Sequence, residues 1–191
     1  MNITADTDLA ALDTVTANLA ALLASIQDHH GALATPCSDW DLTALVDHVT
    51  GGNWFTVAIL SGDRAEDAKS ATIETFGGNS ASIAAAVGSL KDQLDAFHRP
   101  EVLDRTWNHV AGDLNGRQIL RLRLHDLIVH RWDVEETLRP GTDLDDGLAR
   151  WGLDDLAGEG SLAAVHFDLA DPAPAALAGD GAVAYLRLFG R

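Results

Sequence analysis

Cysteine is nearly absent from the sequence, whose 191 residues contain a single one, Cys37. One cysteine excludes an intrachain disulfide and any zinc site built from several cysteines. A metal site in this chain would therefore have to use histidine and carboxylate ligands.

Basic residues are scarce as well, and only two of them are lysines, Lys69 and Lys91. The chain has 29 acidic against 13 basic residues, a formal net charge of -16. Such a surface repels phosphate backbones and anionic membranes, so we expect neither nucleic acid nor a membrane as a partner. No run of 18 apolar residues predicts a transmembrane helix, and the N-terminus lacks the basic start and apolar centre of a signal peptide. We therefore expect a cytoplasmic protein.

Strand patterns are weak, whereas helical periodicity is strong. Hydrophobic residues make up 47% of the chain, enough for a substantial core. Apolar residues recur at helical spacing in four long segments: 6–28, 39–60, 79–98 and 117–138. Four such helices predict an all-α fold, a four-helix bundle. We expect the bundle over residues 1–142 and a short C-terminal extension over 143–191 packed on it, with an acidic helix at 145–156. Residues 61–78 are expected to form a loop with a short helical piece.

The segment TPCSDWD has the composition of a helix start. Pro36 ends what precedes it, and Ser38 with Asp41 three residues later fits a capping box. The second helix should therefore begin close to residue 39.

The fourth helix carries charged side chains on a face that its apolar neighbours place toward the core. Each residue advances about 100° around a helix axis, so Asp126, Asp133 and Arg123 all fall within about 60° of His130. Polar residues on the far side are expected to face solvent: Arg117, Gln118, Arg121, His125, Glu135 and Glu136. Buried charge is costly without a partner, so the inward stripe must form ion pairs or ligate a metal.

A metal site is the sharper interpretation of that stripe. Asp126 and His130 are four residues apart, which brings both side chains onto one face, one turn apart. A third ligand must come from another helix, and His48 on the second helix is the best candidate. Gly51 and Gly52 each cost roughly 1 kcal/mol of helix propensity, and one compensation would be room for an ion beside His48. Two histidines and one carboxylate leave coordination positions open, as in catalytic sites.

Alternatives stay open for each of these side chains. His48 could be a satisfied core histidine, and Asp126 could form only an ion pair with Arg123 or Arg131. Asp133 could orient a ligand histidine through its free ring N–H, or merely pair with it. Arg123 could instead receive the carboxylate of a substrate or thiol.

Other residues rank lower as functional candidates. We expect Trp40 and Trp132 to be packing anchors, with pocket lining as the lesser alternative. Cys37 should be a small buried residue rather than a ligand or nucleophile, and His109 should lie at the surface rather than over the site. No pairing is evident for the remaining histidines outside the stripe: His29, His30, His98 and His166. No general acid or base can be named.

Two motifs carry a resemblance to a known family. The segments TPCSDWDLTALVDHVTGG and LHDLIVHRWD are similar to the DinB/YfiT-like superfamily, and more narrowly to its actinobacterial branch around mycothiol-dependent maleylpyruvate isomerase. The resemblance covers about residues 5–140 and implies a DinB-like four-helix bundle. It also implies that His48, Asp126 and His130 are the metal ligands.

The chain departs from that family pattern in two ways. The acidic ligand of the isomerase is Glu, whereas this chain has the shorter Asp126. The isomerase also has a larger C-terminal domain that contributes a catalytic arginine, and neither Arg187 nor Arg191 can be matched to it.

The resemblance implies an enzyme that binds a divalent metal and uses mycothiol, or another low-molecular-weight thiol, on a small electrophilic substrate. The reaction would be a thiol S-transfer or an isomerisation. Zn²⁺ is the first expectation for the metal, with Ni²⁺, Fe²⁺ and Mn²⁺ as alternatives. One rival interpretation is a non-catalytic protein that binds a metal or small molecule in the same pocket. Another is a bundle whose polar residues only fix the core geometry. A homodimer is compatible with the sequence but not demanded by it.

Overall fold

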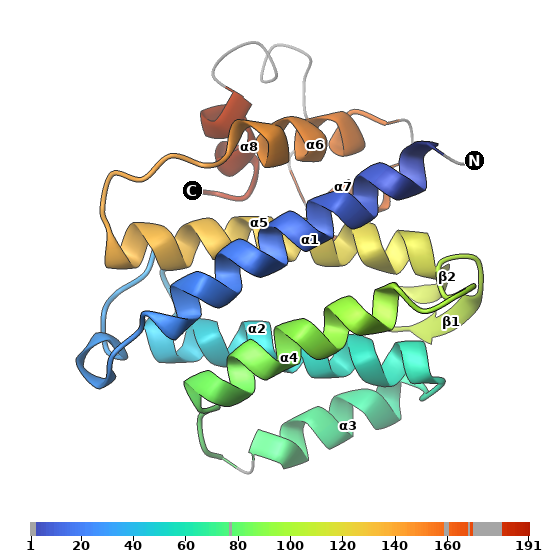
Figure 1. The fold of residues 1–191 in the computed structure, drawn as a ribbon, viewed down its shortest axis with the longest axis horizontal. Coiled ribbons are helices and arrows are strands. Elements are labelled where there is room, and N and C mark those ends of the chain that lie inside the picture. The colour runs from blue at the N-terminus through green and yellow to red at the C-terminus, as the bar shows by residue number, and fades with distance from the viewer. Residues whose placement is uncertain (1–2, 77, 159–160, 168, 170–180) are drawn as a thin grey trace.

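Four long helices form the bundle that the periodicity predicts. The computed structural model describes residues 3–76, 78–158, 161–167, 169 and 181–191. The bundle helices are as follows: α1 (Ile3–Ala24), α2 (Leu42–Ser61), α4 (Ile83–Phe97) and α5 (Gly116–Leu138). Both α1 and α2 pack against α4 and α5 (Figure 1). The predicted all-α, DinB-like fold is thus confirmed.

The core lies between these four helices. On α1, the fully buried side chains recur every three or four residues, at Leu12, Val15, Leu19 and Leu23. That spacing presents one apolar face, as expected for a helix at the rim of a bundle. α5 differs, because 14 of its 23 residues are buried. A helix buried on this scale must be covered on more than one side.

α2 begins later than the sequence predicts. Asp41 is its N-cap, since the Asp41 carboxylate accepts a hydrogen bond from the backbone N–H of Ala44 at 2.8 Å. The predicted capping box of Ser38 with Asp41 is therefore wrong. The residues before Asp41 form a turn of their own, which Thr35 closes by donating its hydroxyl to the carbonyl of Trp40 at 2.8 Å.

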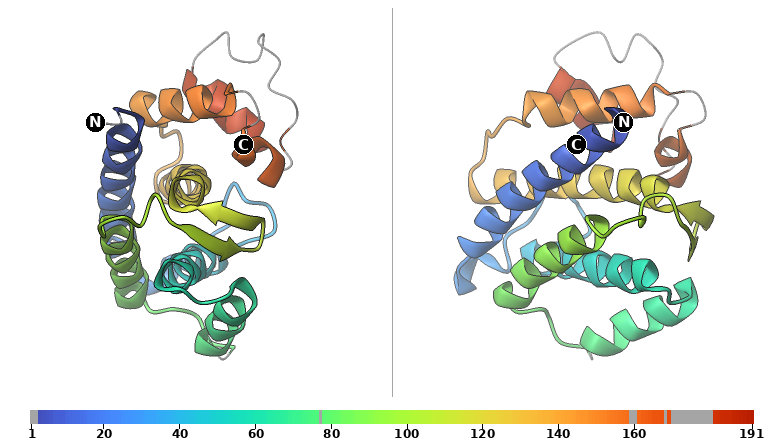
Figure 2. Two further views of the ribbon diagram at one scale, coloured as in Figure 1. Left: turned by 90° about the vertical axis from the view of Figure 1, so that its right-hand side faces the viewer. Right: turned by 45° about the vertical axis from the view of Figure 1, so that its right-hand side comes forward.

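Two connecting elements form regular structure, one of them where the sequence predicts a loop with a short helical piece. α3 (Ala65–Phe76) is a helix of 12 residues that packs against α2 on the outside of the bundle (Figure 2). An antiparallel hairpin of β1 (Thr106–His109) and β2 (Gly112–Asn115) precedes α5. Trp107 anchors this hairpin by donating its indole N–H to the carbonyl of Val102 at 3.1 Å. Strands of four residues are too short to show a clear alternating pattern, which is why the sequence does not predict them.

The segment after α5 covers that helix on the side away from α2. It contains α6 (Asp146–Leu156), α7 (Leu162–His166) and α8 (Gly181–Leu188), and the 3-10 helix η1 (Asp28–His30) lies earlier, after α1. α6 and α8 pack against each other over α5 (Figure 1). α6 corresponds to the predicted acidic helix.

This cover overturns the prediction that His125 faces solvent. His125 is fully buried, with Nδ1 2.7 Å from the hydroxyl of Tyr185 and Nε2 2.9 Å from Oδ2 of Asp155. A helical projection of α5 alone could not reveal it, because the covering residues lie 30 and 60 positions further along the chain.

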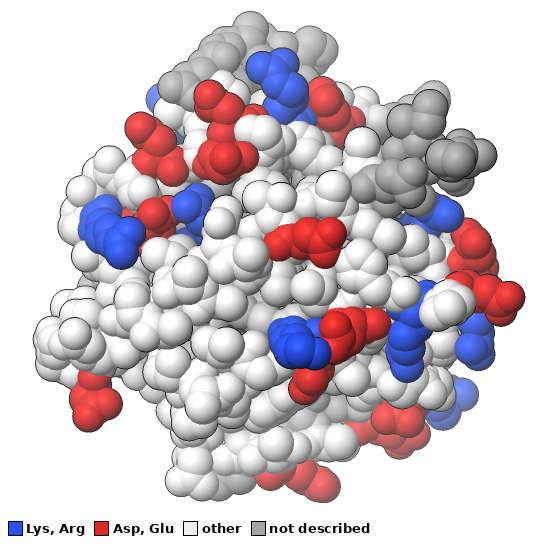
Figure 3. Space-filling view, viewed as in Figure 1, with Lys and Arg blue, Asp and Glu red and all other residues white. Residues whose placement is uncertain are grey.

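The surface shows how the charged residues are distributed. On the face shown in Figure 3, the described Lys and Arg side chains are scattered among acidic and uncharged ones and form no continuous basic surface. Within the described part of the chain, no helix combines the length and apolarity needed to cross a lipid bilayer.

Candidate metal centre

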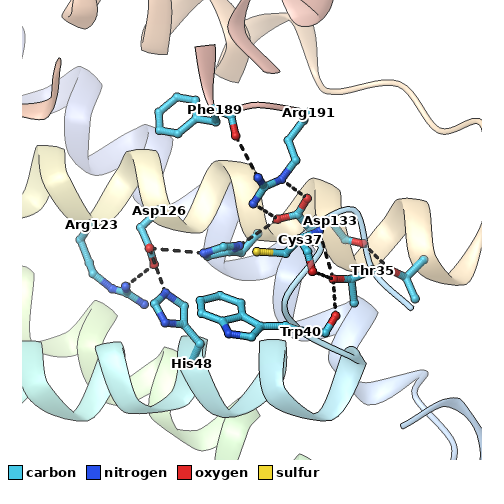
Figure 4. A network of polar contacts seen from close by, with 11 residues as sticks. Thr35, Cys37, Trp40, His48, Arg123, Asp126, Asp133, Phe189 and Arg191 are labelled. Carbon is cyan, nitrogen blue, oxygen red and sulfur yellow. Dashed lines mark hydrogen bonds and ion pairs between the residues drawn. The ribbon is translucent and has the colours of Figure 1, made fainter. Parts of the chain in front are cut away.

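The three predicted ligands lie together between α2 and α5. His48 projects from α2 toward Asp126 on α5 (Figure 4), and His130 follows Asp126 one turn later. Nε2 of His48 lies 3.2 Å from Oδ1 of Asp126, and Nε2 of His130 lies 3.5 Å from the same oxygen. One potential ligand atom from each residue lies within 4.8 Å of the other two.

The two distances to Oδ1 of Asp126 are those expected between neighbouring ligands of a single divalent cation. With tetrahedral bonds of ~2.0–2.1 Å, neighbouring ligand atoms lie about 3.3 Å apart. Two imidazole nitrogens and one carboxylate oxygen are donors that Zn²⁺ and its first-row neighbours accept. Three protein ligands leave positions for a further ligand, which distinguishes catalytic from structural sites. The residues present therefore suit a cation with open coordination positions.

Arg123 holds Asp126 in place. Its side chain is 9% exposed, and Nη1 donates to Oδ2 of Asp126, which leaves Oδ1 facing the histidines. Nε donates to Gln93 at 2.8 Å and Nη2 to Asn53 at 2.8 Å, so the guanidinium is fixed from several sides. Burial works to raise the pKa of Asp126, yet Arg123 and His130 hold that pKa well below its usual range. Asp126 is therefore a carboxylate at neutral pH.

Close packing explains the two glycines of α2. A Cβ on Gly52 would lie 2.6 Å from Nη1 of Arg123, and a Cβ on Gly51 would lie 3.2 Å from the ring of Phe76. The expectation that these glycines leave room for an ion beside His48 is therefore wrong, because a guanidinium and α3 take the space. The contacts of Arg123 favour its ion-pair alternative, and its role in binding a substrate or cofactor stays a prediction.

Asp133 orients His130. Oδ2 of Asp133 lies 2.9 Å from Nδ1 of His130, which fixes the ring with Nε2 directed at Asp126. Burial opposes a charge on His130, but Asp126 and Asp133 together raise its pKa to about 9. His130 is therefore protonated at neutral pH in the metal-free protein, and a cation must displace that proton. Asp133 is itself fully buried and is paired with Arg191.

Trp40 borders the open side of the site. The centroid of its ring lies 4.5 Å from that of His48 and 5.7 Å from that of His130. The side chain of His48 is 37% exposed, against 13% for Asp126 and 9% for His130. A ligand would therefore reach the three groups from the side of His48, past Trp40. Cys37 precedes Trp40 in the same turn and is half-buried, and burial raises the pKa of its thiol.

Two of the lower-ranked residues make contacts of their own. Trp132 is packed against the core and donates its indole N–H to the carbonyl of Thr142 at 3.2 Å, as a packing anchor would. His109 lies in β1 against Phe55 and His166, with ring centroids 5.5 and 6.2 Å away. Burial and His166 lower the pKa of His109 to about 4, so it is neutral at physiological pH.

Two ion pairs also differ from what the sequence indicates. His98 lies 2.9 Å from the carboxylate of Asp13 on α1, a pairing between segments that no local pattern predicts. Arg131 pairs with Glu135 along α5 and not with Asp126.

Sequence reasoning missed a second polar network, on the opposite face of α5. It joins His125 to Tyr185 and Asp155, and Arg121 bridges Asp155 and Asp8 at 3.0 Å each. A cavity of about 690 Å³ lies beside this network, between α1 and α6. None of the three predicted metal ligands lines that cavity, so the candidate site rests on its donor atoms and not on a large hollow.

Comparisons with known proteins agree with the motif resemblance. The family model described as "Mycothiol maleylpyruvate isomerase N-terminal domain" matches residues 12–135, a range that holds all three predicted ligands. Two uncharacterized proteins of Mycobacterium tuberculosis, from two different strains, are each 28% identical to the chain over 130 residues. The match covers 68% of this chain and 66% of each relative, so the chain spans slightly under two thirds of their length. No solved structure matches. Because the family model matches most of the bundle, the chain belongs to the mycothiol maleylpyruvate isomerase N-terminal domain family.

Proposed function

We propose that this chain is a divalent-metal-dependent enzyme that uses a low-molecular-weight thiol, mycothiol in this family, on a small electrophilic substrate. One observation carries the proposal: His48, Asp126 and His130 converge from two helices with separations that suit one cation. Membership of the mycothiol maleylpyruvate isomerase N-terminal domain family supports a thiol as the second reactant at this cluster. The reaction is a thiol S-transfer or an isomerisation through reversible thiol addition.

In this proposal, the protein prepares the ligand set before the metal arrives. Arg123 fixes the carboxylate of Asp126 and Asp133 fixes the ring of His130. Ligands that are already ordered lose little conformational freedom on binding, which favours affinity. Zn²⁺ is the proposed ion, and Ni²⁺, Fe²⁺ and Mn²⁺ accept the same donors.

His48, Asp126 and His130 would hold a divalent cation, and such a cation would lower the pKa of a coordinated thiol enough to deprotonate it near neutral pH. The small thiol would then supply the sulfur that attacks the electrophile, so the protein would need no nucleophile of its own. The raised pKa of Cys37 keeps its thiol protonated and therefore a poor nucleophile, as expected if the small thiol supplies the reacting sulfur. Trp40 offers an apolar wall on the side from which the substrate enters, where it limits access of water to the reacting atoms.

Metal analysis of protein purified without a histidine tag tests the site. We expect about one divalent ion per chain in the wild type, and strongly reduced content in His48→Ala and His130→Ala. His98→Ala is the matched control, because His98 also pairs with an aspartate, Asp13, but on the surface. A wild type that stays metal-free after loading, or ligand variants that bind as well as the control, would refute the metal centre.

A turnover assay separates an enzyme from a non-catalytic binding protein. Metal-loaded protein is incubated with mycothiol and an electrophile such as monochlorobimane, and the conjugate is measured by fluorescence. We expect turnover that depends on both thiol and metal and is lost in His130→Ala. Metal binding without turnover across several thiols and electrophiles would favour the binding protein.

A further inference from the structure

Arg191 is held in a fixed position by the turn that ends α8. The backbone N–H of Gly190 donates to the carbonyl of Arg187 at 3.1 Å, and that of Arg191 donates to the carbonyl of Leu186 at 3.0 Å. Gly190 has a φ of 73°, the left-handed conformation that this type of helix end requires. The backbone therefore directs Arg191 back toward α5.

The side chain of Arg191 pairs with Asp133 through two parallel hydrogen bonds. Nε lies 2.7 Å from Oδ1 and Nη2 lies 3.0 Å from Oδ2, while Nη1 donates to the carbonyl of Phe189 at 2.9 Å (Figure 4). Two-point pairing of this kind fixes the orientation of a carboxylate as well as its charge. Three of the five guanidinium N–H donors of Arg191 are thus engaged within the protein.

Asp133 depends on this partner. Its side chain is fully buried, and a buried carboxylate without a compensating cation is strongly disfavoured. Oδ2, one of the two oxygens that Arg191 holds, also accepts from Nδ1 of His130. Arg191, Asp133 and His130 therefore form a continuous chain of polar contacts that ends at the candidate metal centre.

We propose that Arg191 is a positioning residue of the metal centre, which acts through Asp133 to hold the ring of His130 in its ligand orientation. The inference rests on the proposed metal site and assigns the segment after α8 a role in assembling it. By linkage, a cation that binds His130 and the seating of this segment on α5 must strengthen each other equally.

A double-mutant cycle that measures zinc affinity tests whether Arg191 acts on His130 through Asp133. Removing a residue that orients a metal ligand typically weakens binding by about 10–100-fold. We expect Arg191→Gln to weaken zinc binding by about 10-fold and Arg191→Lys to restore only part of the loss, because Lys lacks the planar fork. Arg187→Gln, an exposed charge-matched control at the end of α8, should leave affinity unchanged.

The cycle is completed in an Asp133→Asn background. If Arg191 acts through Asp133, then Arg191→Gln should change zinc affinity by less than about 2-fold once Asp133 has been altered. Equal effects of Arg191→Gln in both backgrounds, or no effect in the wild-type background with the fold intact by circular dichroism, would overturn the inference.

A measurement without metal keeps this inference separable from the proposed function. In the metal-free protein, the Nδ1 proton of His130 should exchange slowly with solvent by NMR, and Arg191→Gln should speed that exchange while Arg187→Gln does not. A wild type that binds none of Zn²⁺, Ni²⁺, Fe²⁺ and Mn²⁺ but shows this difference would refute the proposed function, while the positioning of the His130 ring by Arg191 would still stand. Zinc binding with no such difference, and with equal affinity in Arg191→Gln, would refute the positioning role alone.

Discussion

Metal binding at this centre should depend steeply on pH, because the cation competes with a proton on His130. The pKa of His130 is raised to about 9 in the metal-free protein, where Asp126 and Asp133 face its two ring nitrogens. At pH 7 only about one molecule in 100 carries the neutral imidazole that a metal requires. Apparent affinity at pH 7 should therefore lie about 100-fold, or ~2.7 kcal/mol, below its limit above pH 9.

The assay is calorimetric titration with zinc held in a competing chelator, at several values between about pH 7 and 8.5. The logarithm of the binding constant should rise by about one unit per pH unit over this range. Repeating the titration in buffers with different heats of ionisation counts the protons released, and we expect about one per zinc at pH 7.5. Zinc affinity rises with pH because Asp126 and Asp133 stabilise the proton on His130, and that proton must leave before the ring can bind the metal.

Two variants sharpen that result. Asp133→Asn removes an anion that raises the pKa of His130, so the pH dependence should move to lower pH. His98→Ala, at the surface pair with Asp13, should leave the dependence unchanged. Affinity that is flat between about pH 7 and 8.5, or zinc binding without proton release, would show that His130 is not a protonated ligand.

Three further predictions concern stability. In the metal-free protein, the raised pKa of His130 adds roughly 3 kcal/mol to the free energy of unfolding below pH 6.5, the pKa of an unfolded-state histidine. This contribution is lost as the pH rises through 9. The melting temperature should therefore fall between pH 6.5 and 9 in the wild type but not in His130→Gln. Gly52→Ala should destabilise the protein by roughly 1–3 kcal/mol in urea unfolding, since its Cβ would clash with Arg123, whereas Gly88→Ala in α4 meets open space and should stabilise it by up to about 1 kcal/mol. Tyr185→Phe leaves buried His125 without one partner and should lower the free energy of unfolding by about 1–3 kcal/mol, and an unchanged unfolding midpoint would contradict the network.

Most of the bundle could be predicted from sequence because helical periodicity is a local signal. The four long helices occur where apolar residues repeat, and their ends shift by a few residues with the capping side chain, as at Asp41. α3 and the hairpin could not be predicted so readily. α3 buries only Ala65 and Ala68 among its 12 residues, so its apolar pattern is weak.

The candidate ligands could be proposed from sequence because Asp126 and His130 share one helix, and family motifs supply His48. What surrounds them required the three-dimensional structure. Arg191 reaches Asp133 across 58 positions of sequence, and Gly52 accommodates Arg123 across 71 positions. Neither pairing can be predicted from residue spacing or composition, because each forms only when segments far apart in the sequence pack together.

Trp40 gives the candidate centre an optical reporter of its own. Its indole lies against both histidine rings, and indole emission is quenched by a protonated imidazole and by paramagnetic ions in close contact. The chain has four other tryptophans, whose emission a Trp40→Phe variant measures on its own. Subtracting that emission from the wild-type signal gives the emission of Trp40. Fluorescence from a single indole can therefore follow both the loss of the His130 proton and the arrival of Ni²⁺ in real time.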